Sequence, residues 1–202
     1  MNQQERILKS ATEQFFQNGI KSVSMDDIAS KLAISKKTIY KHFKDKKTIV
    51  KEVTKNMILH SEHICTEKCN KSTNAVDELL KLIDFINSFF INMNSTVMYD
   101  LEKYYPHSYV IFQEHQNVFL YNSLVNNLER GIKEELFRKN LNIEIIVRLR
   151  MGQIKLAFDQ EFFPVSEFDI RKTQLASLDL YIMGIATCKG REIIDKHHSQ
   201  KD

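Results

Sequence analysis

Residues 24–43 read SMDDIASKLAISKKTIYKHF, a pattern that predicts two short helices separated by a tight turn. Ser24 stands three residues before a carboxylate, so its hydroxyl can cap the first helix. Ser35 is a second N-cap candidate. Ile39 and Phe43 are four residues apart, which places both on the inward face of the helix that Ser35 starts.

An earlier helix precedes this pair. Its apolar residues recur at helical spacing, and Gly19 follows them as a helix-ending glycine; they are Ile7, Leu8, Ala11, Phe15 and Phe16. Two short helices with a tight turn, braced by a preceding helix, form the helix-turn-helix plan of DNA-binding proteins.

The distribution of charge supports a polyanionic partner for this part of the chain. Residues 1–51 carry eleven basic and five acidic side chains, a net charge of +6. The remaining 151 residues carry 18 basic and 21 acidic groups, a net charge of −3. A basic end on a mildly acidic body indicates that the first segment faces nucleic acid.

The rest of the chain also reads as helical, because the 202 residues include only five glycines and two prolines and lack hairpin signals. The sequence therefore predicts an all-α fold. The expected helices span residues 45–71, 75–93, 95–104, 107–133 with an interruption near Gly131, 143–160 and 167–190.

Localisation follows from what the sequence lacks. The first residues form no apolar leader, and no apolar run approaches the roughly 18 residues of a membrane span. Three cysteines are too few for a disulfide framework. We expect a cytoplasmic protein with no membrane partner.

Enzyme signatures are also missing. The sequence contains no G-x-S-x-G elbow, Walker loop, H-E-x-x-H or dinucleotide glycine pattern, so we expect no catalytic residues and no cofactor. The stretch HSEHICTEKC, residues 60–69, leaves a metal or thiol-redox sensor open as an alternative. Its two histidines and two cysteines do not share one helix face, so we expect no metal site.

The stretch from Ile7 to Val53 resembles the DNA-binding domain of the tetracycline-repressor (TetR) family of bacterial transcriptional regulators. The matching positions are Gly19, Ser24, Ile28, Ala29, Ile34, Ser35, Tyr40, Phe43 and Lys46. The resemblance implies a three-helix helix-turn-helix domain over residues 1–46. It also implies a helical bundle over residues 47–202 for effector binding and dimerisation.

One position departs from the family. The turn between the two short helices often contains glycine where this sequence has Ala33. A non-glycine residue in a left-handed conformation costs of order 1 kcal/mol.

Carried over position by position, the resemblance assigns two sets of DNA contacts. Phosphate contacts are implied for Ser24, Ser35, Thr38, His42 and Lys46. Entry into the major groove is implied for Lys36, Lys37, Tyr40 and Lys41. The alternative for the lysines is an ordinary solvated helix face.

An effector would lie between the bundle helices, where ten of the twenty aromatic residues fall between Phe85 and Tyr121. We expect an apolar or aromatic effector, although most of these side chains serve the core by default. The candidate pocket residues are Phe85, Phe89, Tyr109, Phe112, His115 and Phe119.

The last two expected helices, 143–160 and 167–190, carry more apolar surface than the edge of one bundle needs. Pairing with a second copy would bury that surface. The resulting hypothesis is a homodimeric repressor that binds a roughly palindromic operator and is released by an unknown small molecule. The alternative is a small-molecule-binding module or a metal or thiol sensor without effector-driven repression.

Overall fold

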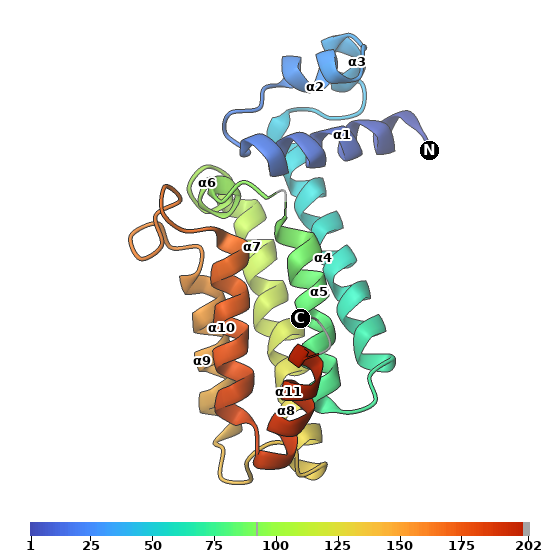
Figure 1. Ribbon diagram of the computed structural model, residues 1–202. Helices are drawn as coiled ribbons and strands as arrows, with labels where there is room; N and C mark the ends of the chain where they lie inside the picture. Colours follow the sequence, from blue (N-terminus) through green and yellow to red (C-terminus); the bar gives the residue numbers. More distant parts are fainter. Residues whose placement is uncertain (92, 200–202) are drawn as a thin grey trace. The chain divides into compact units, whose positions relative to one another are not determined.

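The computed structural model describes residues 1–91 and 93–199, and its regular elements are helices (Figure 1). In chain order they are α1 (Gln3–Asn18), α2 (Met25–Lys31), α3 (Lys36–Tyr40), α4 (Lys46–Asn70), α5 (Ala75–Phe90), α6 (Thr96–Tyr104), α7 (Pro106–His115), the π-helix η1 (Gln116–Leu120), α8 (Tyr121–Lys133), α9 (Ile143–Leu156), α10 (Ile170–Ile185) and α11 (Cys188–Ser199). The all-α prediction is confirmed.

The chain packs into two compact units. The first contains residues 1–60 and 93–115, and the second contains residues 61–91 and 116–199. Helix α4 begins in the first unit and ends in the second. The functional boundary at residue 46 stays a prediction, because compactness does not define function.

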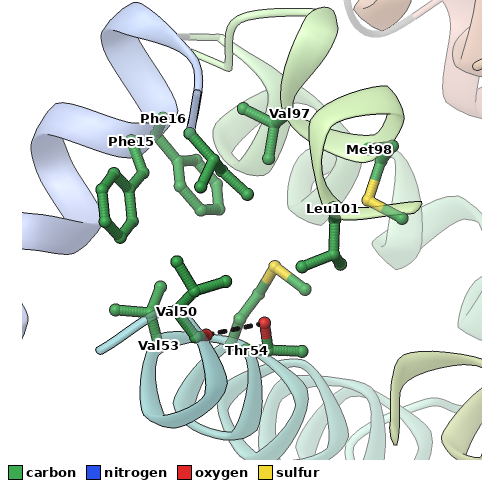
Figure 2. Close-up of a pocket in the computed structure, with 10 residues that line it drawn as sticks. Phe15, Phe16, Val50, Val53, Thr54, Val97, Met98 and Leu101 are labelled. Atoms are coloured by element: carbon green, nitrogen blue, oxygen red, sulfur yellow. Dashed lines mark hydrogen bonds between the residues drawn. The ribbon is translucent and has the colours of Figure 1, made fainter. Parts of the chain in front are cut away.

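The core of the first unit joins the helix-turn-helix segment to α4 and α6. Figure 2 shows Phe15 of α1 opposite Val50 of α4 and Leu101 of α6. The cavity between these helices has a volume of about 20 Å³, which is room for about one water molecule. Helix α6 therefore packs directly on the helix that braces the helix-turn-helix.

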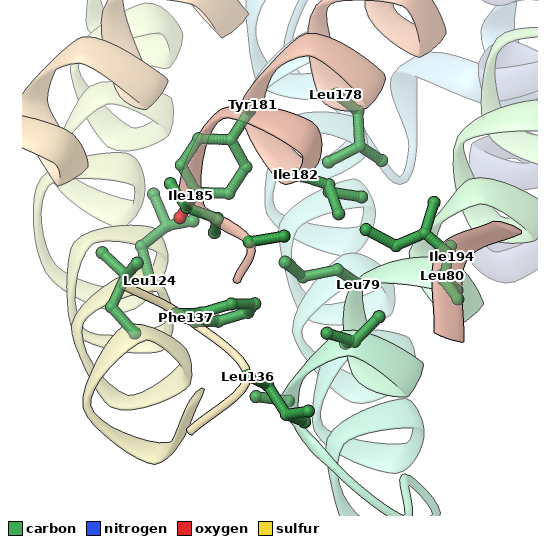
Figure 3. Close-up of a cluster of buried hydrophobic side chains, with 14 of the residues drawn as sticks. Leu79, Leu80, Leu124, Leu136, Phe137, Leu178, Tyr181, Ile182, Ile185 and Ile194 are labelled. Carbon is green, nitrogen blue, oxygen red and sulfur yellow. The ribbon is translucent and has the colours of Figure 1, made fainter. Parts of the chain in front are cut away.

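The core of the second unit gathers side chains from α5, α8, α10 and α11 (Figure 3). Phe137, which follows α8, is fully buried in it. A Cβ atom on Gly131 would lie 2.0 Å from the Phe137 ring, so only glycine allows this close approach. Gly131 thus lies within α8 for a packing reason.

The prediction of one helix over residues 107–133, interrupted near Gly131, is wrong about the place of the interruption. The helical turns run without a gap from Pro106 to Lys133, and the irregularity is the π-helical stretch η1, Gln116–Leu120, whereas Gly131 lies inside α8. A buried glycine and a helix-breaking glycine have the same signature in the sequence.

The prediction of a helix over residues 167–190 is wrong at both ends. Helix α10 begins at Ile170 and ends at Ile185, and α11 starts at Cys188. The break is fixed from outside the helix, because the N–H of Thr187 donates to the carbonyl oxygen of Leu136 at 2.9 Å. The preceding helix is also shorter than predicted, since α9 ends at Leu156 rather than at residue 160.

The turn between α2 and α3 holds a non-glycine residue in a left-handed conformation, which costs conformational energy. Ala33 has a φ of 53°, in the left-handed region that favours glycine. Its N–H donates to the carbonyl oxygen of Ser30 at 3.1 Å, and the N–H of Ile34 donates to that of Ala29 at 3.1 Å. The turn is therefore built with a residue that is strained in it.

We expect Ala33→Gly to stabilise the protein by about 0.5 kcal/mol. Relief of left-handed strain is worth about 1–2 kcal/mol, and the greater entropy of glycine in the unfolded chain offsets about 0.4–1 kcal/mol of it. Urea unfolding would measure the change. Ala176→Gly, at an exposed site in α10, is the control and should instead destabilise by about 1 kcal/mol. A loss of stability in Ala33→Gly would contradict the strain argument.

Candidate nucleic-acid interface

The start of α2 is fixed by a reciprocal cap. The carboxylate of Asp27 accepts hydrogen bonds from the N–H and the hydroxyl of Ser24, both at 2.7 Å. The hydroxyl of Ser24 in turn accepts from the N–H of Asp27 at 3.2 Å. These bonds from Ser24 hold the pKa of the Asp27 carboxyl below its ordinary value. The cap predicted at Ser24 is confirmed.

Helix α3 is fixed from both ends. The hydroxyl of Ser35 accepts from the N–H of Thr38 at 3.1 Å and lies 2.9 Å from the Thr38 hydroxyl. Ile39 is fully buried, and Phe43 is 2% exposed. One side of this short helix is therefore locked into the first unit, and the other side has a defined orientation.

The outward side of α3 and the residues that follow it carry most of the predicted DNA contacts. Tyr40 is 48% exposed although it is aromatic, and Thr38 is half-buried. The exposed basic side chains are Lys36, Lys37, Lys41 and His42. These donors around an exposed phenol suit phosphates and base edges.

Lys36 is the member of this face that has an acidic partner. Its ammonium lies 2.8 Å from the carboxylate of Asp26, the residue that opens α2 after Met25. The hydrogen bond to Asp26 raises the pKa of Lys36 above its ordinary value. Both side chains are exposed, so the pair contributes little stability and does not prevent Lys36 from turning to another anion.

Lys46 lies in a different environment from the other predicted contacts. Its ammonium is half-buried and donates to the carbonyl oxygens of Ile20 at 2.5 Å and of Lys21 at 3.3 Å. Burial lowers its pKa. In this structure Lys46 ties the start of α4 to the turn after α1, and its role as a phosphate contact stays a prediction.

Helix α6 also contacts the turn after α1. The N–H of Lys21 donates to the carboxylate of Asp100 at 2.8 Å, and the Lys21 ammonium donates to the hydroxyl of Tyr104 at 3.0 Å. Gly19 has a φ of 82°, and a Cβ there would lie 2.7 Å from the hydroxyl oxygen of Thr96. We call these five residues the α6 junction.

No motif in the sequence indicates the α6 junction. Asp100 is 79 residues from Lys21, and neither residue belongs to a motif. Gly19 was recognised only as a helix end. Its second role, close contact with α6, depends on tertiary packing.

The six predicted pocket residues are half-buried. Phe85 and Phe89 of α5 belong to the second unit, with ring centroids 5.4 Å apart, and Phe119 of η1 belongs to the same unit. The other three, Tyr109, Phe112 and His115, belong to α7 in the first unit. Their common pocket stays a prediction.

The outer faces of α9 and α10 expose large apolar side chains. Leu149 is 59% exposed and Ile145 is 54% exposed on α9, and Leu180 is 70% exposed on α10. A Cβ on Gly184 would meet nothing within 4 Å, so this surface also has room for a close neighbour. By contrast Ala186, two residues after Gly184, is buried in the core.

A metal or thiol-redox site gains no support. Among residues 1–91 and 93–199, no three histidine, cysteine or acidic side chains gather as metal ligands. Burial raises the pKa of the Cys65 thiol to about 11, which suppresses the reactive thiolate. In the same described ranges, no helix is both long and apolar enough to cross a membrane.

We expect Cys65 to resist alkylation at neutral pH. With a pKa of about 11 in place of 9.0, its thiolate fraction is about 100-fold lower than that of an ordinary thiol. Iodoacetamide labelling followed by peptide mass spectrometry would measure the rate, with the exposed Cys188 as internal control. Equal labelling of Cys65 and Cys188 at pH 7.5 would show that Cys65 is a reactive thiol.

Comparison with known proteins finds similarity to bacterial regulatory proteins. Residues 7–53 match the family model described as bacterial regulatory proteins, tetR family. The Staphylococcus aureus biofilm operon icaADBC negative transcriptional regulator IcaR is 24% identical over 177 residues, which cover 81% of this chain and 89% of IcaR.

Solved structures share the fold. A TetR-family regulator from Agrobacterium tumefaciens superposes with a TM-score of 0.74 at 17% identity, covering 91% of this chain and 97% of the other. The Bacillus subtilis regulator FadR, in complex with stearoyl-CoA, has a TM-score of 0.66 at 18% identity, with 90% and 98% of the two chains covered. At this identity the likeness concerns the fold.

Proposed function

Because this chain belongs to the TetR family of bacterial regulatory proteins, whose members are transcriptional regulators and not enzymes, we propose that it is a dimeric cytoplasmic repressor. The observation that carries the proposal is the outward side of α3. Its lysines and Tyr40 are exposed, while Ile39 and Phe43 fix the helix from inside. If this side of α3 packed into an apolar core, Tyr40 would be buried rather than exposed between lysines.

Side-chain chemistry indicates which residues of this face contact bases and which contact phosphates. Lys37, Tyr40 and Lys41 enter the major groove together with Lys36, once its pair with Asp26 opens. Lysine donates to guanine O6 and N7, and Tyr40 contacts a thymine methyl or a phosphate. Ser24 and Ser35, Thr38, His42 and Lys46 complete the interface with phosphates.

The dimer forms through α9 and α10. Leu149 and Leu180 are more than half exposed, and a two-fold contact would remove both from water. Two copies then present two α3 helices to successive major grooves, about 34–36 Å apart, on a roughly palindromic operator.

The effector is an apolar or aromatic small molecule that binds in the bundle. The half-buried aromatic residues Phe85 and Phe89 of α5 support this, and the structure of FadR, which shares the fold, contains stearoyl-CoA. Binding changes the position of α4 and thereby the spacing of the two α3 helices. It does so only through different affinities for two conformations.

The α6 junction offers a second connection to the DNA-binding helices. Asp100 and Tyr104 hold the turn after α1, and Lys46 holds the same turn from α4. Movement of either α4 or α6 would therefore shift the turn after α1, and this turn positions α2 and α3.

The proposal predicts sequence-selective and salt-sensitive DNA binding. A fluorescence-anisotropy titration would compare the chain's own upstream region with a random duplex over a range of salt concentrations. We expect preference for the upstream region and a steep loss of affinity with salt, because lysine contacts release counterions from phosphates. Equal affinity for both duplexes at moderate salt would contradict selective regulation at that region.

A further inference from the structure

A small polar cluster lies between α9 and α10, inside the second unit. It consists of Arg150 from α9 and of Ser177 and Tyr181 from α10. Arg150 is 4% exposed and Tyr181 is 6% exposed, so both are buried within a single chain. The Nη1 atom of Arg150 donates to the hydroxyl of Ser177 at 2.8 Å. None of the three residues belongs to the predicted DNA contacts or to the candidate pocket residues.

The charge of Arg150 is buried without an opposite charge. Among residues 1–91 and 93–199, no carboxylate forms an ion pair with it. The acidic residue of α9, Glu144, instead accepts from Arg148 and Tyr121, and the acidic residue of α10, Asp179, is exposed. Burial lowers the pKa of the Arg150 guanidinium to about 10, which leaves it charged at neutral pH. A buried charge of this kind is costly, and a bound anion would relieve the cost.

Tyr181 supplies a second donor beside this charge. The Cζ atom of Arg150 lies over its ring, 5.5 Å from the ring centre, a contact that leaves the N–H groups of the guanidinium unused. In Figure 3 the ring of Tyr181 points from α10 toward Leu124 of α8. The hydroxyl is buried and has no hydrogen-bond partner within the part of the chain that the structure describes. Burial raises the pKa of Tyr181, so the hydroxyl keeps its proton and can donate it to an anion.

The size of the buried charge indicates which anion fits. The cluster contains one guanidinium and two hydroxyl groups, and the neighbouring basic residues of α9, Arg148 and Lys155, are exposed. A carboxylate carries one negative charge and accepts two parallel N–H bonds from a guanidinium. A phosphate dianion would leave one negative charge buried without a partner. The cluster therefore favours a carboxylate.

The surroundings of the cluster are apolar. Tyr181 belongs to the core of the second unit, and the partly buried side chains packed against this core include Leu120 and Met151. Phe85 and Phe89, the candidate pocket residues of α5, belong to the same unit. A ligand whose carboxylate reaches the guanidinium would therefore have apolar side chains around the rest of its structure. This environment favours an acid with an apolar body over a small inorganic ion.

We propose that the effector is a carboxylic acid with an apolar body, and that Arg150 and Tyr181 bind its carboxylate. The inference rests on the proposed function, because it specifies the head group of the effector proposed for the bundle. The carboxylate would connect α9 to α10. Both helices also carry the proposed dimer contact, so an acid that bridges them can alter the arrangement of the two copies.

Isothermal titration calorimetry on the full chain without DNA tests the proposal with an aliphatic acid, dodecanoate, and an aromatic acid, 2-naphthoate. Dodecanol and 2-naphthalenemethanol are the uncharged comparisons. At least one acid should bind at least tenfold more tightly than its alcohol. Arg150→Met should weaken binding of that acid about 100-fold, and Tyr181→Phe about tenfold. Arg148→Met removes an exposed arginine from the same helix and should leave acid binding unchanged.

Urea unfolding of the protein without ligand separates binding from a structural role. Arg150→Met removes a buried charge that lacks a carboxylate partner, and Tyr181→Phe removes a hydroxyl that lacks any partner among the described residues. Both variants should therefore unfold at the same urea concentration as the wild type or at a higher one. A residue that served only the core would show the opposite shift.

Three results would overturn the proposal. One is that neither acid binds, and another is that the alcohols bind as tightly as the acids. The third is unchanged acid binding in Arg150→Met and Tyr181→Phe. If Arg150→Met does not fold, Tyr181→Phe decides, because it removes a single oxygen atom. Acid binding is measured without DNA and operator selectivity is measured without acid, so the failure of this inference is distinguishable from the failure of the proposed function.

Discussion

Leu149→Glu combined with Leu180→Glu is expected to convert the protein into a monomer. The two leucines are 59% and 70% exposed on α9 and α10, so glutamate fits each site in a single chain. In a dimer, however, four buried carboxylates would face one another without partners. Affinity for a full operator should fall at least 100-fold, because one chain contacts only one half-site.

Analytical ultracentrifugation would give the oligomeric state, and a titration on full and half operators would give the affinity. Leu59→Glu is the matched control, since Leu59 is 62% exposed on α4. It should leave the dimer intact. A double variant that sediments as a dimer would show that the subunits associate through another surface.

Lys37→Ala combined with Tyr40→Ala is expected to abolish sequence selectivity while leaving the fold intact. Both side chains are exposed, so their removal opens no cavity. Contacts to base edges are worth about 1–3 kcal/mol each, so the pair accounts for about 100-fold or more of the preference for the operator.

Circular dichroism would confirm the fold, and competition between the operator and a random duplex would give the selectivity. Lys51→Ala removes one exposed lysine of α4 and is the control for net charge. It should weaken binding to both duplexes slightly and leave the ratio of the two affinities unchanged. An unchanged ratio in the double variant would mean that α3 does not read the bases.

Local signals in the sequence were sufficient for the helix-turn-helix. The caps at Ser24 and Ser35 and the inward pair Ile39 and Phe43 depend on residues three or four apart, and all were predicted. The left-handed strain at Ala33 was implied by the resemblance to the TetR family, whose turn often contains glycine at this position. These features need no information from the rest of the chain.

Features that depend on distant contacts were missed. The break after Ile185 is set by a hydrogen bond to Leu136, and the close contact of Gly131 is set by Phe137. The α6 junction pairs Lys21 with a residue 79 positions away. Amphipathic periodicity shows which residues are apolar, but it does not show which helix covers them.

Lys46 shows the same limit at the candidate site, because its contacts within the protein were not predicted. Its position in the family pattern implies a phosphate contact, which stays a prediction, and in the structure its ammonium donates to the carbonyl oxygens of Ile20 and Lys21. The charge of a lysine can be read from sequence, but the direction of its flexible side chain depends on the acceptors that folding brings within reach.

The central claim is that α3 of a dimer reads an operator. Selection of genomic DNA fragments by the purified protein, followed by sequencing, tests it most directly. The account predicts enriched fragments that share a roughly palindromic motif, with half-sites about 34–36 Å apart, and no enrichment with the Lys37→Ala, Tyr40→Ala variant. Enrichment without a shared motif, or the same motif selected by that variant, would contradict it.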